Sequence, residues 1–381
     1  MHLLDTTLFY APQSGGIKRY LMAKHAWLCS HPRITHTLLV PGGYNSRWLP
    51  ASKVTLRSPP LPFGKGHRLP LNLHRWHCAL RALKPDLIEA EDPYHLAWLA
   101  LHGGRELDVP VVGFYHSDLP RLLATRFGVT AQHYGKAYIR QLYRRFDLVL
   151  APSKVLVEKL QQEFGIERAR QQPLGVDILN FHPRLKDPSL RRSLGLPADT
   201  RLLIFAGRFS AEKKLPVLLE AMKLLGRPYH LLLVGGGAIL PQQANVTVLS
   251  YQQNVATLAR LLASCDALAH PGDQETFGLV VLEAMACGLP VIGMAAGGVA
   301  ELVDERVGLL APPRNAKALA EAIAGFYQLN RFKMGLEARR KAESQYSWDR
   351  IIPQLLGHYN GLLDAGARLP ATGASSFYVA R

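Results

Sequence analysis

Short apolar segments alternate with longer amphipathic segments along the second half of the chain. Apolar runs of four to six residues have the length of buried strands, and the stretches between them show helical spacing. Such alternation predicts repeated strand-helix-strand units and a mainly parallel sheet. The expected elements follow one another at residues 202–206, 215–225, 230–234, 255–264, 267–270, 277–287 and 290–293.

The first half repeats this pattern less regularly and predicts a second sheet. Residues 1–5 are expected to form its first strand, because they lack the basic flank, long apolar core and cleavage pattern of a signal peptide. The other expected strands are 36–40, 87–90, 111–115 and 148–151, with helical stretches between them at 94–101 and 154–164.

The chain has 381 residues, which is too long for one ordinary core and favours two domains. Residues 183–200 are rich in Pro, Arg and Asp and have no clear periodicity, so the boundary is placed beside them. We predict an amino-terminal domain over 1–180 and a carboxyl-terminal domain over 181–350. A helix at 351–365 is expected to pack back on the first domain, and 366–381 reads as a loose tail.

Composition excludes several classes of protein. With 48% hydrophobic and 19% charged residues, the chain has the content of a globular protein. Its apolar runs are far shorter than the roughly 20 residues of a membrane-spanning helix, and a cytoplasmic location is expected. The four cysteines are scattered without a Cys-x-x-Cys pair, which disfavours a disulfide framework and a structural zinc site.

A formal net charge of +16 indicates an anionic partner without naming it. A nucleic-acid role is disfavoured, because no zinc-finger, ribonucleoprotein or basic-zipper pattern accompanies the charge. Lys136, Arg140 and Arg144 recur every four residues on one predicted helix. That helix either lies on anionic lipid, as a peripheral contact with the inner face of a membrane, or is a core helix with a solvated basic face.

The most specific motif is a pair of glutamates, Glu275 and Glu283, on either side of a predicted helix entry. Gly278 between them removes a side chain where a ligand can approach the backbone. Helix-entry amides suit an anion, and carboxylates accept hydrogen bonds from sugar hydroxyls. Taken alone, the pair also fits an ordinary capped helix with Glu283 in solvent.

Two basic residues strengthen the ligand interpretation. Arg208 and Lys213 follow the predicted first strand of the second domain. Arg208 comes directly after Gly207, and Lys213 lies five residues further on. Ligands of parallel sheets bind at the carboxyl ends of strands, where two fixed cations suit a diphosphate. Residues 235–237, three glycines after another strand, are expected to form a further turn with exposed backbone.

These motifs resemble the family-4 group of retaining glycosyltransferases, known also as glycosyl transferases group 1, over nearly the whole chain. The resemblance implies the GT-B fold, α/β with two Rossmann-like doubly wound domains facing across a cleft. It also implies that Arg208 and Lys213 hold the donor diphosphate, that Glu275 contacts hydroxyls of the transferred sugar, and that Glu283 binds the nucleotide ribose. His270 upstream also looks like the family, although a strand-end histidine can equally fill the core.

The amino-terminal half carries matching features. Gly15 and Gly16 follow the first strand and resemble the family's glycine pair near the donor phosphates and acceptor. His116 follows the strand at 111–115 and resembles the histidine that contacts the donor sugar, whereas Asp118 suits a turn cap equally well. The resemblance thus makes the catalytic set His116, Arg208, Lys213 and Glu275, and the donor-binding set Gly15, Gly16, Gly207, Phe277, Gly278, Leu279 and Glu283.

The implied reaction needs no cofactor. A nucleotide diphosphate is a good leaving group whose charge cations stabilise, and the chain has no Asp-x-Asp signature of a metal-diphosphate site. Retention of configuration is implied by the resemblance, and front-face attack is the preferred interpretation because no covalent nucleophile stands out.

The segments at 115–118 and 173–177 look most similar to the branch with mannosyltransferases and lipid-directed enzymes, which use GDP-mannose or UDP-hexoses. The resulting hypothesis is hexosyl transfer from a nucleotide sugar to a lipid or saccharide hydroxyl. The alternatives are a nucleotide-sugar epimerase, a phosphorylase, or a catalytically silent sugar-nucleotide-binding protein.

Overall fold

A computed structural model of the chain describes residues 1–11, 14–48, 53–62 and 66–364. The expected loose tail at 366–381 lies outside these residues. The described chain forms two compact units. Unit 1 comprises Met1–Ala151, Val157–Gln172 and the chain from Pro353 onward, and unit 2 comprises Pro152–Leu156 and Pro173–Ile352.

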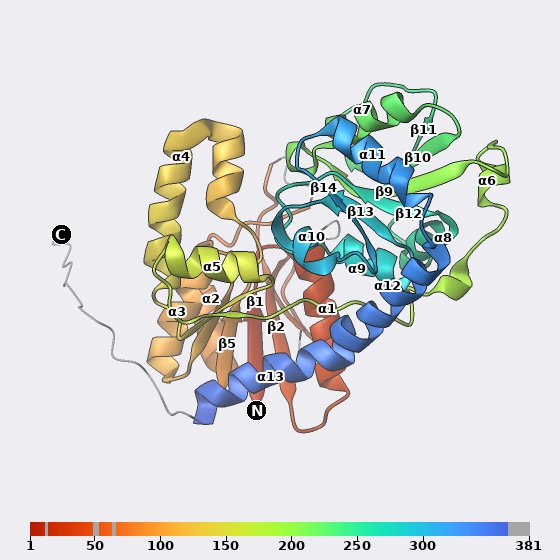
Figure 1. The fold of residues 1–381 in the computed structure, drawn as a ribbon. Coiled ribbons are helices and arrows are strands. Elements are labelled where there is room, and N and C mark those ends of the chain that lie inside the picture. The colour runs from red at the N-terminus through yellow and green to blue at the C-terminus, as the bar shows by residue number, and fades with distance from the viewer. Residues whose placement is uncertain (12–13, 49–52, 63–65, 365–381) are drawn as a thin grey trace. The chain divides into compact units, whose positions relative to one another are not determined.

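Unit 1 is built on a sheet whose described strands run in the order β3-β4-β2-β1-β5-β6-β7-β8, all parallel except β3 (Figure 1). The order reverses at β1, which pairs with β2 on one side and β5 on the other. The strands are β1 (His2–Thr6), β2 (Thr35–Gly42), β3 (Ser46–Trp48), β4 (Lys53–Arg57), β5 (Leu87–Ala90), β6 (Val111–Phe114), β7 (Leu148–Ala151) and β8 (Ala169–Gln171). The helices are α1 (Gly16–Cys29), α2 (Leu73–Leu83), α3 (His95–Leu107), α4 (Leu119–Tyr143) and most of α5 (Lys154–Gln162).

The central strands of unit 1 are buried on both faces. All four residues of β5 and of β7 are buried, which explains the continuous apolar run of β7, whereas β5 also buries Glu89. The predictions of strands at 87–90 and 148–151 are confirmed to the residue.

Unit 2 is built on a second, wholly parallel sheet with the described strand order β11-β10-β9-β12-β13-β14. Here the order reverses at β9, between β10 and β12. The strands are β9 (Arg201–Phe209), β10 (Tyr229–Gly237), β11 (Val246–Leu249), β12 (Ala267–His270), β13 (Val291–Met294) and β14 (Gly308–Ala311). The helices are α6 (Leu190–Ser193), α7 (Leu215–Leu225), α8 (Val255–Ser264), α9 (Leu279–Ala286), α10 (Gly297–Leu302), α11 (Ala316–Phe326) and α12 (Arg331–Tyr346), with short 3₁₀ helices at Pro183–Leu185 and Ala211–Lys213.

The expected helices at 215–225 and 255–264 are confirmed as α7 and α8. The expected turn at residues 235–237 is wrong, because these glycines continue β10 and pair with the end of β9. A Cβ atom on Gly235 would lie 1.8 Å from the carbonyl oxygen of Gly207. The glycines therefore allow two strands to approach closely, and they do not form a loop.

Helix α4 is a helical hairpin rather than one continuous helix. Gly128 interrupts it with a φ of 83°, and in Figure 1 the ribbon folds back on itself there. The two halves pack closely, since a Cβ atom on Gly135 would lie 3.2 Å from Cα of Pro120. Phe127 and Val129 flank the interruption with exposed fractions of 64% and 79%.

The last described helix, α13 (Trp348–Asp364), begins three residues before the expected 351–365 and includes it up to residue 364, since residue 365 lies outside the described residues. From Pro353 onward it belongs to unit 1. Its Tyr359 is fully buried there and accepts a hydrogen bond of 2.8 Å from the ammonium of Lys24.

Candidate active site

In unit 2, Lys213 and Glu275 come together although they are far apart in the sequence. Lys213 ends the short helix that follows β9, and Glu275 lies in the loop that follows β12. These strands are neighbours at the point where the strand order reverses, which is where open parallel sheets bind ligands. The Lys213 ammonium donates a hydrogen bond to Oε1 of Glu275.

Burial controls the charges around this pair. Burial, and then the charge of Arg208, lowers the pKa of Lys213 to about 8. His270, the last residue of β12, is fully buried, and its Nε2 lies 3.2 Å from Oε1 of Glu275 without forming a hydrogen bond. Burial, and then the charge of Lys213, lowers the pKa of His270 to about 3, so its ring is neutral at physiological pH.

Arg208 lies beside Glu212 and does not take part in the hydrogen bond between Lys213 and Glu275. Its side chain is 80% exposed, and its guanidinium lies 3.8 Å from the carboxylate of Glu212. A long side chain held so loosely is free to turn toward a ligand at the strand end.

The entry of α9 presents backbone to the loop that carries Glu275. Gly278 caps the helix with a φ of 106°, a conformation that favours glycine, and Leu279 is the first helical residue. Phe277 is buried, and a Cβ atom on Gly298 would lie only 2.5 Å from its Cα. Glu275 and Phe277 therefore lie on a loop that leads into α9 and packs against Gly298.

Gly297 and Gly298 at the start of α10 were missed from the sequence. The amide of Gly298 donates to the carbonyl of Glu275 at 2.8 Å, and a Cβ atom on Gly297 would lie 2.5 Å from the same carbonyl oxygen. The available signal was this glycine pair, which directly follows an apolar strand.

Glu283 lies inside α9 and has only 5% of its surface exposed. The interpretation of Glu283 as a solvated helix residue is therefore wrong. Burial, and then the charge of Glu283, raises the pKa of the Cys287 thiol to about 12. A buried carboxylate is costly unless it is paired or hydrogen-bonded.

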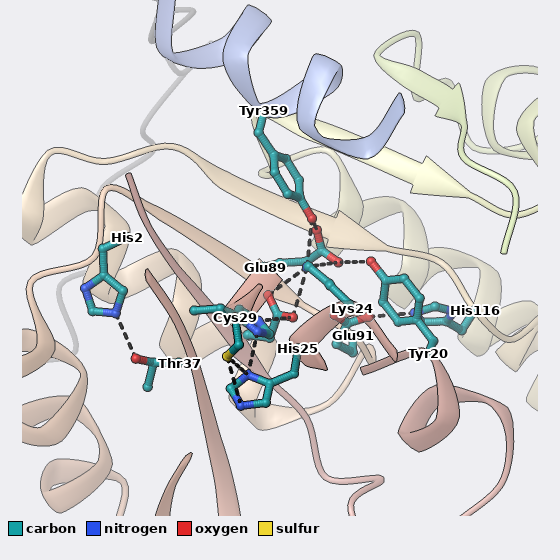
Figure 2. Close-up of polar contacts among 12 residues, drawn as sticks. His2, Tyr20, Lys24, His25, Cys29, Thr37, Glu89, Glu91, His116 and Tyr359 are labelled. Atoms are coloured by element: carbon teal, nitrogen blue, oxygen red, sulfur yellow. Dashed lines mark hydrogen bonds and ion pairs between the residues drawn. The ribbon is translucent and has the colours of Figure 1, made fainter. Parts of the chain in front are cut away.

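In unit 1, His116 lies two residues beyond β6, and Glu91 directly follows the neighbouring β5. Nε2 of His116 and Oε2 of Glu91 are 2.6 Å apart, and both residues are buried (Figure 2). Burial, and then the charge of Lys24, lowers the pKa of His116 to about 3. The sequence indicated the histidine and missed its partner, although the acidic run at 89–92 after a strand was a visible signal.

Asp118 caps α4. Its carboxylate accepts hydrogen bonds from the Arg121 amide at 3.3 Å and the Tyr115 hydroxyl at 3.2 Å, and it pairs with Lys159. The turn-capping interpretation of Asp118 is therefore confirmed.

Gly15 and Gly16 begin α1, at the end of the loop that follows β1. A Cβ atom on Gly15 would meet no heavy atom within 4 Å, so the backbone there faces open space. Close by the same sheet edge, a hollow of about 50 Å³ opens in unit 1. Its lining includes Phe9, Ile17, Glu91, Tyr94 and Ser117.

Two doubly wound sheets, each with polar groups gathered where its strand order reverses, define the GT-B class of glycosyltransferases. The fold is shared with sucrose-phosphate synthase from Thermosynechococcus elongatus, with a TM-score of 0.76, 23% identity, and coverage of 96% of this chain and 100% of that chain. Anabaena Alr3699/HepE in complex with UDP also shares it, with a TM-score of 0.74, 21% identity, and coverage of 95% and 99%.

Sequence comparison then gives the family. Residues 186–345 match Glycosyl transferases group 1, and residues 14–178 match Glycosyltransferase Family 4. A GDP-mannose-dependent alpha-mannosyltransferase of Mycobacterium tuberculosis (strain CDC 1551 / Oshkosh) is 35% identical over 80% of this chain and 81% of its own length. A GDP-mannose-dependent alpha-(1-6)-phosphatidylinositol dimannoside mannosyltransferase of M. tuberculosis (strain ATCC 25177 / H37Ra) is 28% identical over 93% and 95%. The chain belongs to this glycosyltransferase family and is a hexosyltransferase, which confirms the resemblance drawn from its motifs.

Within the described ranges, none of the helices combines the length and apolar content needed to cross a membrane.

Proposed function

We propose that the chain transfers mannose from GDP-mannose to a hydroxyl group of a glycolipid acceptor, with retention of configuration. The observation that carries the proposal is the pairing of Lys213 with Glu275 at the ligand-binding edge of the second sheet. The printed activities of the mycobacterial relatives supply the donor and the kind of acceptor.

Each group at this edge suits one part of the donor. Lys213 and Arg208 stabilise the diphosphate charge that grows as the sugar leaves, and Glu275 accepts hydrogen bonds from sugar hydroxyls. Glu283 binds the ribose, and the α9 entry offers amides to the phosphates. His116 lies in unit 1, and its proposed contact with the sugar comes from the family resemblance. Because side-chain cations supply the charge, the reaction needs no metal ion.

Donor and acceptor use test the proposal. Purified enzyme is offered GDP-mannose, UDP-glucose and UDP-galactose, each with phosphatidylinositol mannosides or with a water-soluble mannoside, and nucleoside diphosphate release is measured with and without EDTA. We expect GDP release with the glycolipid, an α-linked mannose in the product by NMR, and no effect of EDTA. Release of UDP alone, a β-linked product, or loss of activity in EDTA would each overturn the corresponding part.

Substitutions test the assignment of the diphosphate site. Arg208→Ala and Lys213→Ala are each expected to lower kcat by about 100-fold with little change in melting temperature. Lys223→Ala is the control, because this exposed lysine on α7 has a pair 4.0 Å away in Glu220 and lies outside the site. Near-normal turnover in both site variants would refute the assignment.

Contact with an anionic membrane would fit a lipid acceptor, and we propose the tip of the α4 hairpin as the place of that contact. Of the basic residues considered from the sequence, Lys136 pairs with Glu163 at 3.0 Å, and Arg140 donates to the carbonyl of the same residue at 2.9 Å. The Lys136 ammonium is therefore paired, and the Arg140 guanidinium is hydrogen-bonded, within unit 1. The tip of the α4 hairpin, with exposed Phe127 and Val129, offers the apolar surface that partitions into a headgroup region.

Sedimentation with vesicles tests this membrane contact. Phe127→Ser with Val129→Ser is expected to lower binding to vesicles containing anionic lipid by roughly tenfold, since each lost apolar side chain weakens partitioning. Binding to neutral vesicles is expected to be weaker throughout and to vary less with salt. Equal sedimentation of the wild type and the double variant with anionic vesicles would refute the proposed contact.

A further inference from the structure

His116 contacts Glu91, a residue that the motifs in the sequence did not indicate. Nε2 of His116 and Oε2 of Glu91 are 2.6 Å apart, and Glu91 has 1% of its surface exposed. The two residues follow adjacent parallel strands, so the sheet fixes their separation. The contact is therefore built into the strand ends and does not depend on a surface loop.

Aromatic rings fix the plane of the His116 ring. The Phe114 ring stacks on it with a centroid distance of 3.9 Å and an interplanar angle of 8°. The Tyr20 ring lies at a centroid distance of 5.3 Å. Phe114 and Tyr20 hold the imidazole ring of His116 in place. The question that remains is which of its two nitrogens carries the proton.

A buried charge cluster surrounds Glu91 (Figure 2). Lys24 lies 2.9 Å from Asp5 and 3.2 Å from Glu89, so these two carboxylates balance its charge. Tyr359 of α13 also donates a hydrogen bond to Glu89. Glu91 therefore lies near two further carboxylates, Asp5 and Glu89, and Lys24 is already paired with both of them.

These surroundings disfavour charge on both members of the pair. Burial, and then the negative charges of Glu89 and Asp5, raises the pKa of Glu91 well above its usual value. The pKa of His116 is lowered to about 3, chiefly by burial. Both shifts favour a neutral acid beside a neutral imidazole, in which the acid donates and the ring nitrogen accepts.

We propose that Glu91 is a positioning residue whose protonated carboxyl donates to Nε2 of His116 and thereby places the ring proton on Nδ1. A neutral imidazole that accepts at one nitrogen must carry its proton on the other. His116 then offers Nδ1–H as an uncharged hydrogen-bond donor. That this donor is directed at a hydroxyl of the transferred sugar rests on the proposed function.

The proton on His116 can be located without any substrate. In enzyme labelled with ¹⁵N-histidine, the His116 signals are those that disappear in His116→Asn, and their shifts distinguish a protonated from an unprotonated nitrogen. We expect a protonated Nδ1 and a bare Nε2, unchanged from pH 5.5 to 8. A protonated Nε2, or an imidazolium in this range, would overturn the proposal. The titratable groups facing the ring are Tyr20 and Lys24 on α1, Asp5 on β1, and Glu91 after β5.

Kinetics of two variants separate positioning from mere packing. Glu91→Gln keeps an N–H donor of the same shape, so kcat is expected to stay within about threefold of wild type with the same tautomer. Glu91→Leu removes the donor, and kcat is expected to fall by about tenfold or more while KM for the donor changes little, because the ring then mixes two tautomers. Asp147→Asn is the control. The Asp147 carboxylate accepts a hydrogen bond from the amide of Val111, at the end of β6 that lies away from His116.

Wild-type kcat in a folded Glu91→Leu variant would contradict the proposal. If that variant does not fold, the spectra of wild type and Glu91→Gln still decide where the proton lies. Because those spectra need no donor, they also separate a failure of this inference from a failure of the GDP-mannose assignment.

Discussion

Replacing Lys213 by arginine is expected to remove an alkaline limit on donor capture. The drop in the Lys213 pKa from 10.5 to about 8 corresponds to roughly 3 kcal/mol against the charged form. The free enzyme therefore loses its ammonium as the pH rises through 8, and at pH 9 only about one molecule in eleven retains it. If the charge is needed for the diphosphate, kcat/KM falls about tenfold between pH 7 and pH 9.

The assay is the pH profile of kcat/KM for nucleoside diphosphate release between pH 6 and 10, since this ratio reports the groups of the free enzyme. In Lys213→Arg the guanidinium stays charged throughout, so the alkaline limb is expected to disappear even if the whole profile is lower. In Lys213→Met activity is expected to be low at every pH. A bound diphosphate favours the ammonium, so the limb in kcat is expected at higher pH than the limb in kcat/KM.

Two results would refute this reasoning. A wild-type profile that stays flat to pH 10 would mean that the Lys213 charge is not titrated or not used. An alkaline limb that persists unchanged in Lys213→Arg would assign the titration to another group. Measuring Lys223→Arg in parallel controls for the general effect of adding a guanidinium on this domain.

Three further outcomes are expected. Glu283→Gln should raise the Kd for GDP by about tenfold in calorimetry while leaving kcat nearly unchanged, because ribose contacts are made equally in the ground and transition states. Lys24→Met should lower the free energy of unfolding by about 3–5 kcal/mol in denaturant titrations, because Asp5 and Glu89 are left buried without their cation. The pKa of His270 is lowered in the folded state, so protons bind preferentially to the unfolded chain below pH 6.5, and stability falls as the pH falls toward 3. His270→Asn should therefore lessen acid destabilisation by roughly 2 kcal/mol at pH 5, and equal slopes of stability against pH in the two proteins would contradict this.

The sequence predicted the fold well because the sheets are mainly parallel and their central strands are buried. The strand at 148–151 is a bounded apolar run, and the helix at 215–225 has one continuous apolar face. The hairpin in α4 was not predicted, because a single Gly128 inside a helical pattern is usually tolerated without a break. The glycines at 235–237 misled for a related reason, since close approach of strands and a turn require the same residue type.

The site was predictable only where a motif and a strand end coincide. Lys213 and Glu275 satisfy both conditions, and the structure brings them into contact. Glu91 lies at a strand end but belongs to no motif. Its contact with His116 could be inferred only after β6, the strand before His116, was known to lie beside β5. Strand order is set by long-range packing, which periodicity along the chain does not encode.

Both units pair a lysine with carboxylates, but the surroundings of the two lysines differ. In unit 1, Lys24 lies among Asp5 and Glu89, so its charge is balanced within the protein. In unit 2, Lys213 donates to Glu275 at a strand end beside His270, and burial, followed by the charge of Arg208, lowers the pKa of Lys213 to about 8. A bound diphosphate favours the charged form of an ammonium whose pKa is lowered in the free protein. On the proposed function, Lys213 then supplies a cation where charge develops on the leaving group, and His116 offers an uncharged imidazole to a sugar hydroxyl.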